Sequence, residues 1–185
     1  MLHPDQIRIA VTGPESTGKS ALTQELARHF NAVAVDEFAR DYVAGLNRPY
    51  TYDDILYIAQ QQMLSEDNAA LKAPVIICDT ELVVTKIWCE VKYNICHPWI
   101  LEELKKRRYD LVLLCNTDIP WQEDPLREHP HFRQELMQMY QEQVGQAYSN
   151  VYEVRSVGQT RVQNAIKAVN SLLEQHKDFH ENSCR

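Results

Sequence analysis

A chain of 185 residues with 44% hydrophobic residues has enough apolar material for one buried core, which argues against a disordered protein. Its 26 acidic and 19 basic residues leave a formal charge of −7, so neither nucleic acid nor a membrane surface is an expected partner. The five cysteines form no C-x-x-C pair, which favours reduced thiols over disulfides or a zinc site. The start of the chain lacks a basic and then apolar leader, and no apolar run approaches the ~18 residues of a membrane span. We therefore expect a cytoplasmic protein.

Short apolar runs alternate with longer helical patterns along the chain. The runs predict five strands, at residues 7–11, 33–35, 75–78, 111–115 and 151–154. The patterns predict helices at about 19–30, 53–71, 81–93, 99–107, 132–148 and 159–175. This alternation predicts an α/β fold with a five-stranded parallel sheet and helices on both faces. The motif GPESTGKS at residues 13–20 makes the expected fold one of the P-loop NTPase type. We expect a single domain over residues 1–175, followed by a polar, frayed tail at 176–185.

One motif explains what such a fold would bind. Residues 13–20 read GPESTGKS, which matches G-x-x-x-x-G-K-[ST], and they lie after an apolar strand and before a helix. In this motif the glycines let the backbone wrap around phosphate, the lysine adds a positive charge, and the serine can ligate Mg²⁺. The expected cofactors are thus ATP and Mg²⁺. The predicted ATP-binding positions are Gly13, Glu15, Ser16, Thr17, Gly18, Lys19, Ser20 and the next residue, Ala21, with Lys19 also acting in catalysis.

Acidic residues follow two of the predicted strands. Asp79 comes directly after the third strand, where an acid that orients magnesium is expected, although it could instead cap the next helix. Asp36, Glu37 and Arg40 follow the second strand and should lie at the same edge of the sheet. A carboxylate there could bind sugar hydroxyls or take the proton of an attacking hydroxyl. Glu37 and Asp79 are the two candidates for the catalytic base.

The longest irregular stretch, at about 116–131, is predicted to be a lid. A lid for phosphoryl transfer needs a cation that neutralises the developing charge, and Arg127 is the first candidate for this catalytic role. Trp88 and Trp121 are more often core residues than ligand contacts. Either one could nevertheless supply an aromatic face to a substrate ring.

In this order, the residues resemble the ribosylnicotinamide kinase domain of NadR-type NAD-salvage proteins, which is similar to nucleoside kinases. The resemblance implies that MgATP phosphorylates the 5′-hydroxyl of a riboside. It also implies that Glu37 and Arg40 face the sugar, Asp79 the metal and Arg127 the phosphates. The matching stretches are residues 13–20, 37–43, 78–81 with 84–85, 109–113, 120–121 and 126–127.

One position departs from the family. Where members commonly have a tryptophan that stacks on the nicotinamide ring, this chain has Asp36. A carboxylate at that position would attract the positively charged pyridinium, which predicts a preference for nicotinamide riboside over uncharged nucleosides. Asp36 could instead face solvent or cap the following helix.

The sequence therefore predicts a kinase whose partner is a small riboside, with nicotinamide riboside as the leading acceptor. Another nucleoside or a vitamin alcohol is the alternative acceptor, and a non-catalytic nucleotide sensor or AAA-like ATPase module is an alternative class. A regulatory GTPase is disfavoured because residues 116–119 read NTDI instead of N-K-x-D, and Leu82 stands where a glycine would follow Asp79. Nothing in the sequence indicates the oligomeric state.

Overall fold

The computed structural model describes residues 6–124, 127 and 131–183, with side chains as far as residue 176. Its centre is a five-stranded sheet with the order β2-β3-β1-β4-β5, in which every pair of neighbours is parallel. The strands are β1 (Ile7–Thr12), β2 (Val33–Val35), β3 (Val75–Asp79), β4 (Leu111–Cys115) and β5 (Val151–Val154). The predicted strands and their parallel arrangement are confirmed. β1 and β3 each extend one residue beyond their predicted ends.

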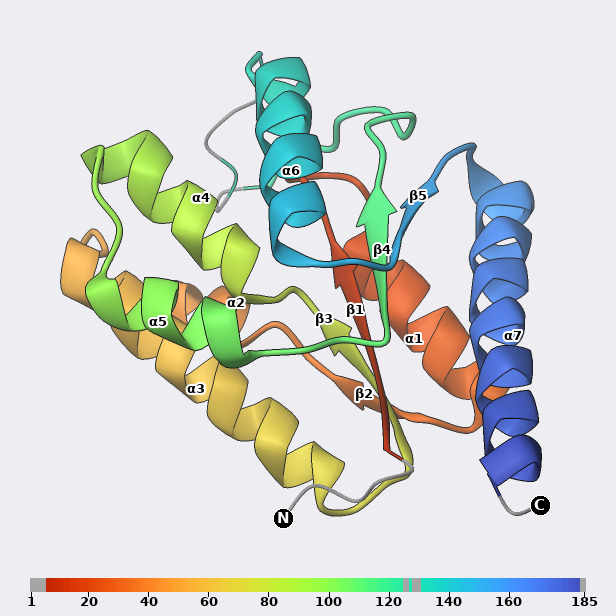
Figure 1. Cartoon of the computed structure of the whole chain (residues 1–185). Helices are drawn as coiled ribbons and strands as arrows, with labels where there is room; N and C mark the ends of the chain where they lie inside the picture. The colour runs from red at the N-terminus through yellow and green to blue at the C-terminus, as the bar shows by residue number, and fades with distance from the viewer. Residues whose placement is uncertain (1–5, 125–126, 128–130, 184–185) are drawn as a thin grey trace.

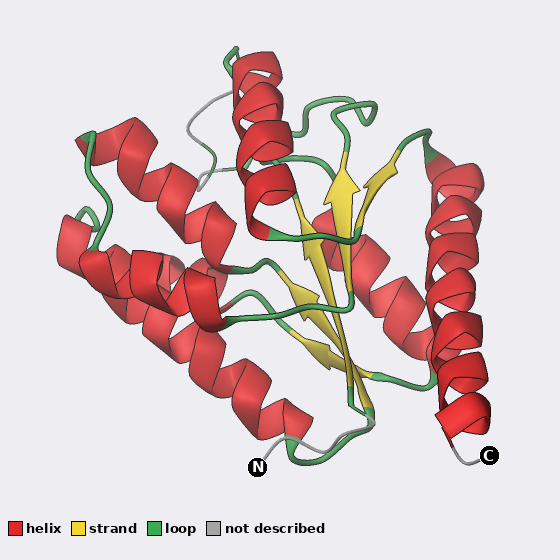
Figure 2. Ribbon diagram, viewed as in Figure 1, coloured by secondary structure: helices red, strands yellow, loops and turns green. Residues whose placement is uncertain are grey.

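Helices cover both faces of this sheet (Figures 1 and 2). One face carries α1 (Lys19–Phe30) and α7 (Gly158–Ser183). The helices on the other side are α2 (Phe38–Ala44), α3 (Tyr52–Ala70), α4 (Leu82–Tyr93), α5 (Pro98–Lys106) and α6 (Arg133–Ala147). The predicted α/β architecture with two covered faces is therefore confirmed.

An apolar cluster lies on each face of the sheet, because successive side chains of a strand point to opposite faces. Ile9 and Val11 of β1 point to the face of α1 and α7, where they pack with Leu26 and Val169. Ala10 points to the other face, in the same cluster as side chains of α4 and α6. Because both faces are covered, the central strands are buried on both sides and read as continuous apolar runs.

Two helical segments differ from the prediction. α2 was not predicted. It buries none of its seven residues, and the side chain of its N-cap residue, Glu37, makes no capping hydrogen bond. It therefore has neither the apolar stripe nor the cap that marks a helix in sequence. α7 continues to Ser183, beyond the predicted end at 175, so the predicted frayed tail is helical for most of its length. Leu172 is the last buried apolar residue among the side chains that the structure describes, and beyond it the sequence shows no helical period.

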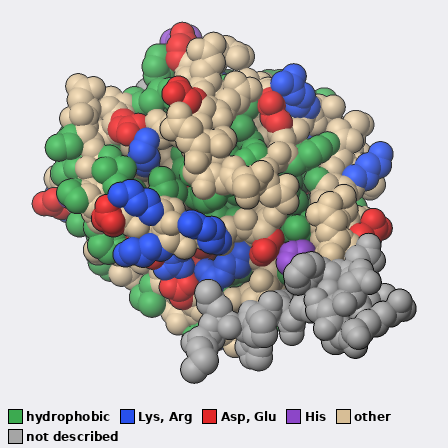
Figure 3. All heavy atoms as spheres, viewed as in Figure 1, with side chains coloured by type: hydrophobic (Ala, Val, Ile, Leu, Met, Phe, Trp, Pro, Cys, Tyr) green, Lys and Arg blue, Asp and Glu red, His purple; other side chains and the backbone are tan. Residues whose placement is uncertain are grey.

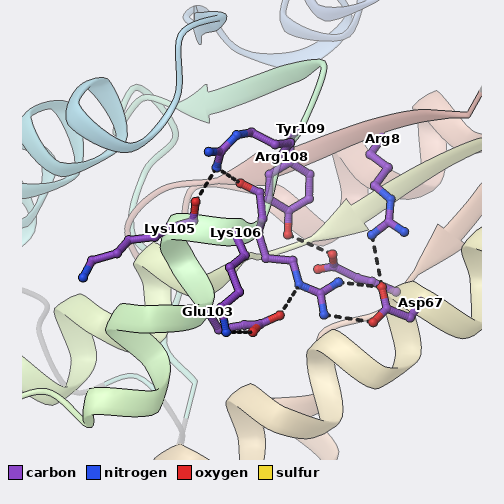
Figure 4. A network of polar contacts seen from close by, with 9 residues as sticks. Arg8, Asp67, Glu103, Lys105, Lys106, Arg108 and Tyr109 are labelled. Atoms are coloured by element: carbon purple, nitrogen blue, oxygen red, sulfur yellow. Dashed lines mark hydrogen bonds and ion pairs between the residues drawn. The ribbon is translucent and has the colours of Figure 1, made fainter. Parts of the chain in front are cut away.

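A cluster of basic side chains surrounds the end of α5, on the face drawn in Figure 3. The run Lys105 to Arg108 forms this cluster. Lys105 pairs with Glu102. Arg107 pairs with Glu103 and with Asp67 of α3 (Figure 4). It lies where β4 begins, at the opposite edge of the sheet from the strand ends that carry the predicted site. Among the described residues, the helices are all too short or too polar to cross a membrane.

Candidate active site

The loop between β1 and α1 has the conformation that the motif requires. Gly13 has a φ of 133°, and a Cβ added there would lie 2.6 Å from the backbone oxygen of Cys115, so only glycine fits. The Thr17 hydroxyl donates a hydrogen bond to the Pro14 oxygen at 2.8 Å, which closes the loop. Lys19 Nζ donates to the Gly13 and Pro14 oxygens at 2.9 and 3.0 Å. The lysine charge is thus held against the cradle that anions would enter.

A buried arginine supports this loop from behind. Arg161 of α7 is 3% exposed. Its Nη2 donates to the Thr17 oxygen at 2.9 Å and to the Asn116 oxygen at 3.2 Å, and its Nη1 donates to the Ser156 oxygen at 3.0 Å. One side chain thereby ties the phosphate loop to the segments after β4 and β5. Arg161 was not predicted, because a single basic residue in a helical pattern carries no signal of a contact 144 positions away.

Asp79 ends β3 and pairs in register with Val11 of β1, so its carboxylate lies beside the phosphate loop. Burial raises its pKa to about 6, while the Lys19 charge and the hydrogen bond from the Ser20 hydroxyl act in the opposite direction. Its Oδ1 is buried and has no hydrogen-bond partner within the described part of the chain. An orphaned carboxylate oxygen beside a hydroxyl offers the oxygen ligands that Mg²⁺ prefers.

The oxygen atoms of Asp79 and Ser20 fit the way Mg²⁺ binds in phosphoryl-transfer sites. No group of three or more His, Cys, Asp or Glu side chains that could hold a metal occurs among the residues that the structure describes. Mg²⁺ does not need such a cage, because it keeps several waters and takes one or two protein ligands together with substrate phosphates. Asp79 and Ser20 are the residues that would hold it here.

The two acids after β2 have different surroundings. Asp36 is exposed and accepts a hydrogen bond of 2.7 Å from Gln24 of α1, and it is not among the residues that line the cleft beside the phosphate loop. Glu37 lines that cleft. Besides burial, the charges of both acids raise the pKa of Asp79. Glu37 is therefore the acid that lies in the cleft, and the role of Asp36 in attracting a cationic ring stays a prediction.

Arg40 connects α2 to the segment predicted as the lid. Its Nη1 lies 2.9 Å from Oδ2 of Asp124, and this hydrogen bond raises the Arg40 pKa. Arg40 lines the same cleft as Glu37. The α2 side of the site is therefore joined to residues after β4.

Two arginines reach the phosphate loop from the lid side. Arg127 Nη1 donates to the Ser16 hydroxyl at 3.3 Å. Arg133, the first residue of α6, donates from Nη2 to the Ser16 oxygen at 3.1 Å, and its pKa is lowered by burial and then by the charge of Arg127. Both guanidinium groups lie about 6 Å from the centre of the Trp121 ring, at 5.9 and 5.8 Å. Two cations converging on one loop residue are suited to an anionic ligand.

Part of the predicted lid, residues 125–126 and 128–130, lies outside the described residues. Arg127 itself is described, and it occupies the place expected for the lid arginine. Arg133 was not predicted, because it follows the irregular stretch and belongs to a helix.

A cleft of about 630 Å³ joins these parts. The phosphate loop from Gly13 to Ala21 forms one wall. Trp88 and Lys92 of α4 line it together with Tyr50, and Tyr50 Oη accepts hydrogen bonds from Trp88 Nε1 at 2.9 Å and from Lys92 Nζ at 2.5 Å. Trp121 is not among the lining residues. Of the two tryptophans considered from sequence, Trp88 is therefore the one that can offer an aromatic face.

The fold and this loop define a nucleotide-binding protein with a P-loop kinase-like architecture. A family model described as an AAA domain matches residues 8–164. The chain belongs to that family.

The chain is also similar to NadR proteins. The trifunctional NAD biosynthesis/regulator protein NadR of Escherichia coli (strain K12) is 32% identical over 145 residues, which cover 72% of this chain and 35% of NadR. A crystal structure of NadR with NAD and AMP-PNP matches with a TM-score of 0.68 and 25% identity, over 91% of this chain and 49% of that one. NadR with NR matches with a TM-score of 0.72 and 22% identity, over 91% and 51%. The chain is thus homologous to NadR but spans about a third of the length of this relative.

Proposed function

We propose that this chain is an ATP-dependent kinase that phosphorylates a hydroxyl of a ribosyl metabolite, with nicotinamide riboside as the leading acceptor and nicotinamide mononucleotide as the product. The observation that carries the proposal is the single cleft in which the phosphate loop, Glu37 and the aromatic pair Trp88 and Tyr50 share the lining. A phosphate donor at the loop and a riboside between the other residues would then meet within one cavity.

The reaction needs little covalent chemistry from the protein. The acceptor hydroxyl oxygen attacks the γ-phosphorus, the bond from that phosphorus to the β–γ bridging oxygen breaks, and ADP leaves. Glu37 takes the hydroxyl proton, since its carboxylate lines the cleft and makes no hydrogen bond to a described side chain. Lys19, Arg127 and Arg133 neutralise charge that develops on the transferred group. Mg²⁺, when bound by Asp79 and Ser20, would supply further charge neutralisation at the phosphates.

The choice of a riboside acceptor rests on homology and on the aromatic wall. NadR is a protein of NAD biosynthesis, and one of its structures contains NR. In this chain, the Trp88 ring is held by its hydrogen bond to Tyr50 and packs edge-to-face with it at 4.8 Å between ring centres. A fixed indole face attracts a cationic pyridinium ring by roughly 0.5–2 kcal/mol.

Consumption of ATP with and without a panel of ribosides tests the proposal. We expect ADP to form with MgATP and nicotinamide riboside, to form more slowly with uridine or cytidine, and not to form without an acceptor. Lys19→Ala serves as the inactive control. A neutral nucleoside or a vitamin alcohol as the best substrate would reject nicotinamide riboside and keep the kinase. ATP binding without consumption for every acceptor would favour a non-catalytic nucleotide sensor.

A further inference from the structure

A buried carboxylate lies behind the candidate site and has no role in the chemistry proposed above. Glu81, two residues after Asp79, is 1% exposed. Its Oε1 accepts a hydrogen bond from the Thr12 hydroxyl at 2.9 Å. Its Oε2 accepts one from the Val83 amide and one from the Tyr148 hydroxyl, both at 2.6 Å. Three donors therefore converge on one buried carboxyl group, and both of its oxygens have partners.

The three donors lie on three elements that surround the cleft. Thr12 is the last residue of β1 and directly precedes Gly13 of the phosphate loop. Val83 lies in the first turn of α4, the helix that carries Trp88. Tyr148 caps the carboxyl end of α6, the helix that begins with Arg133. Glu81 therefore connects the phosphate wall, the aromatic wall and the helix that follows the lid.

The identity of the residue indicates more than helix capping. Glu81 is the N-cap of α4 and accepts from Val83 there, but serine, threonine, aspartate and asparagine are the residues that helices prefer at this position. The longer side chain of glutamate caps the helix and also reaches Thr12 and Tyr148. The preceding residue, Thr80, has a φ of 73°, which is an unfavourable backbone conformation for a β-branched residue. The surrounding contacts hold this unfavourable backbone in place.

We infer that Glu81 is a positioning residue that couples the phosphate loop to α4, so that nucleotide bound at the loop fixes the helix that would contact the acceptor. The connection runs from the loop through Thr12 to the carboxylate and from the carboxylate to the first turn of α4. The consequence for catalysis rests on the proposed function, whereas the coupling itself requires only nucleotide binding.

Hydrogen exchange measures the coupling without any acceptor. In the wild-type chain, MgADP should slow amide exchange in the phosphate loop and also in residues 82–88 of α4. In Thr12→Val, which deletes one donor to the carboxylate, the loop should still respond to MgADP. Exchange in residues 82–88 of the nucleotide complex should then be about tenfold faster than in the wild type, as expected for the loss of one buried hydrogen bond.

The chain offers a matched control. Tyr109 and Tyr148 both lie in the buried cluster on the α4 and α6 side of the sheet, and their rings meet at 5.5 Å. Tyr109 donates a hydrogen bond of 2.8 Å to buried Glu66, which is not connected to Thr12 or to α4 by a hydrogen bond (Figure 4). Tyr109→Phe therefore removes the same kind of bond from the same core. We expect Tyr148→Phe, but not Tyr109→Phe, to speed the exchange of residues 82–88.

Kinetics supply a second readout. Glu81→Gln should lower turnover of the riboside by on the order of 10²-fold, the effect of a misplaced acceptor, while the KM for ATP changes little. Thr12→Val combined with Glu81→Gln should lower turnover hardly further than Glu81→Gln alone, because both changes break the same connection. If Glu81→Gln does not fold, Thr12→Val and Tyr148→Phe carry the test.

Equal exchange of residues 82–88 in Thr12→Val and in Tyr109→Phe would overturn the inference and leave Glu81 a stabilising residue only. If no riboside is phosphorylated by the wild-type chain, the proposed function fails. The exchange experiment then still decides whether Glu81 couples the two walls.

Discussion

Glu66 gives the sharpest quantitative prediction for the fold. This acid of α3 is fully buried, and Tyr109 donates a hydrogen bond to one of its oxygens. The other oxygen is buried without a hydrogen-bond partner among the described residues. Burial raises the Glu66 pKa to about 8, against the opposing effects of the Tyr109 hydrogen bond and the charges of Arg107 and Arg8. The carboxyl group is therefore neutral in the folded protein at neutral pH.

The sign of the pH dependence follows from proton binding. Between the ordinary glutamate pKa of 4.5 and the folded value of about 8, the folded state binds the proton and the unfolded state does not. The free energy of unfolding therefore falls as pH rises, by up to about 1.4 kcal/mol per pH unit. From pH 6 to pH 8, the ionisation of Glu66 alone should lower the free energy of unfolding by about 2 kcal/mol.

Glu66→Gln isolates this effect, because the amide stays neutral and its oxygen can still accept the Tyr109 hydrogen bond. Urea unfolding of both proteins at pH 6, 7 and 8 gives the two free energies at each pH. Their difference removes the contribution of histidines and other groups common to both proteins. We expect Glu66→Gln to gain about 2 kcal/mol relative to the wild type over this range. Parallel stability profiles would show that Glu66 is ionised in the fold and would refute the reasoning.

Three further predictions concern catalysis. Lys19→Ala should abolish phosphoryl transfer and leave the circular dichroism spectrum intact, because the lysine charge at the loop serves the phosphates; normal turnover in the folded variant would reject the phosphate-loop assignment. Glu37→Gln should lower turnover by on the order of 10²-fold or more, since an amide cannot take the hydroxyl proton. If Glu37→Gln is nearly silent and Asp79→Asn keeps normal magnesium affinity, the two acids exchange roles. Arg127→Ala should lower turnover by on the order of 10³-fold with little change in ATP affinity, because its charge acts mainly in the transition state. An equal loss of turnover and ATP affinity would indicate instead that Arg127 binds ATP in the ground state.

The sheet and the phosphate loop could be predicted because their signals are local. The strand at 111–115 is buried on both faces and reads as an uninterrupted apolar run. The loop at 13–20 carries its own motif between a strand and a helix. The meeting of Glu37 and Asp79 was also predictable, because parallel strands bring their carboxyl ends to one edge.

The contacts that complete the site could not be predicted in the same way. Arg161 reaches the loop from the last helix, and Glu81 meets Tyr148 across 67 positions of the chain. Such pairs depend on how helices pack on the sheet, which no short pattern records. The sequence alone also did not indicate which of the two adjacent acids, Asp36 or Glu37, lines the cleft.

The position of the transferred phosphoryl group tests the central claim most directly. Nicotinamide riboside, MgATP and the wild-type chain are incubated, and the product is examined by ³¹P NMR with proton coupling. We expect a new phosphomonoester coupled to the two 5′-methylene protons of the ribose, formed in equal amount to ADP and absent with Lys19→Ala. ADP and inorganic phosphate as the only new phosphorus species, or ATP that stays intact with every riboside tested, would contradict the account.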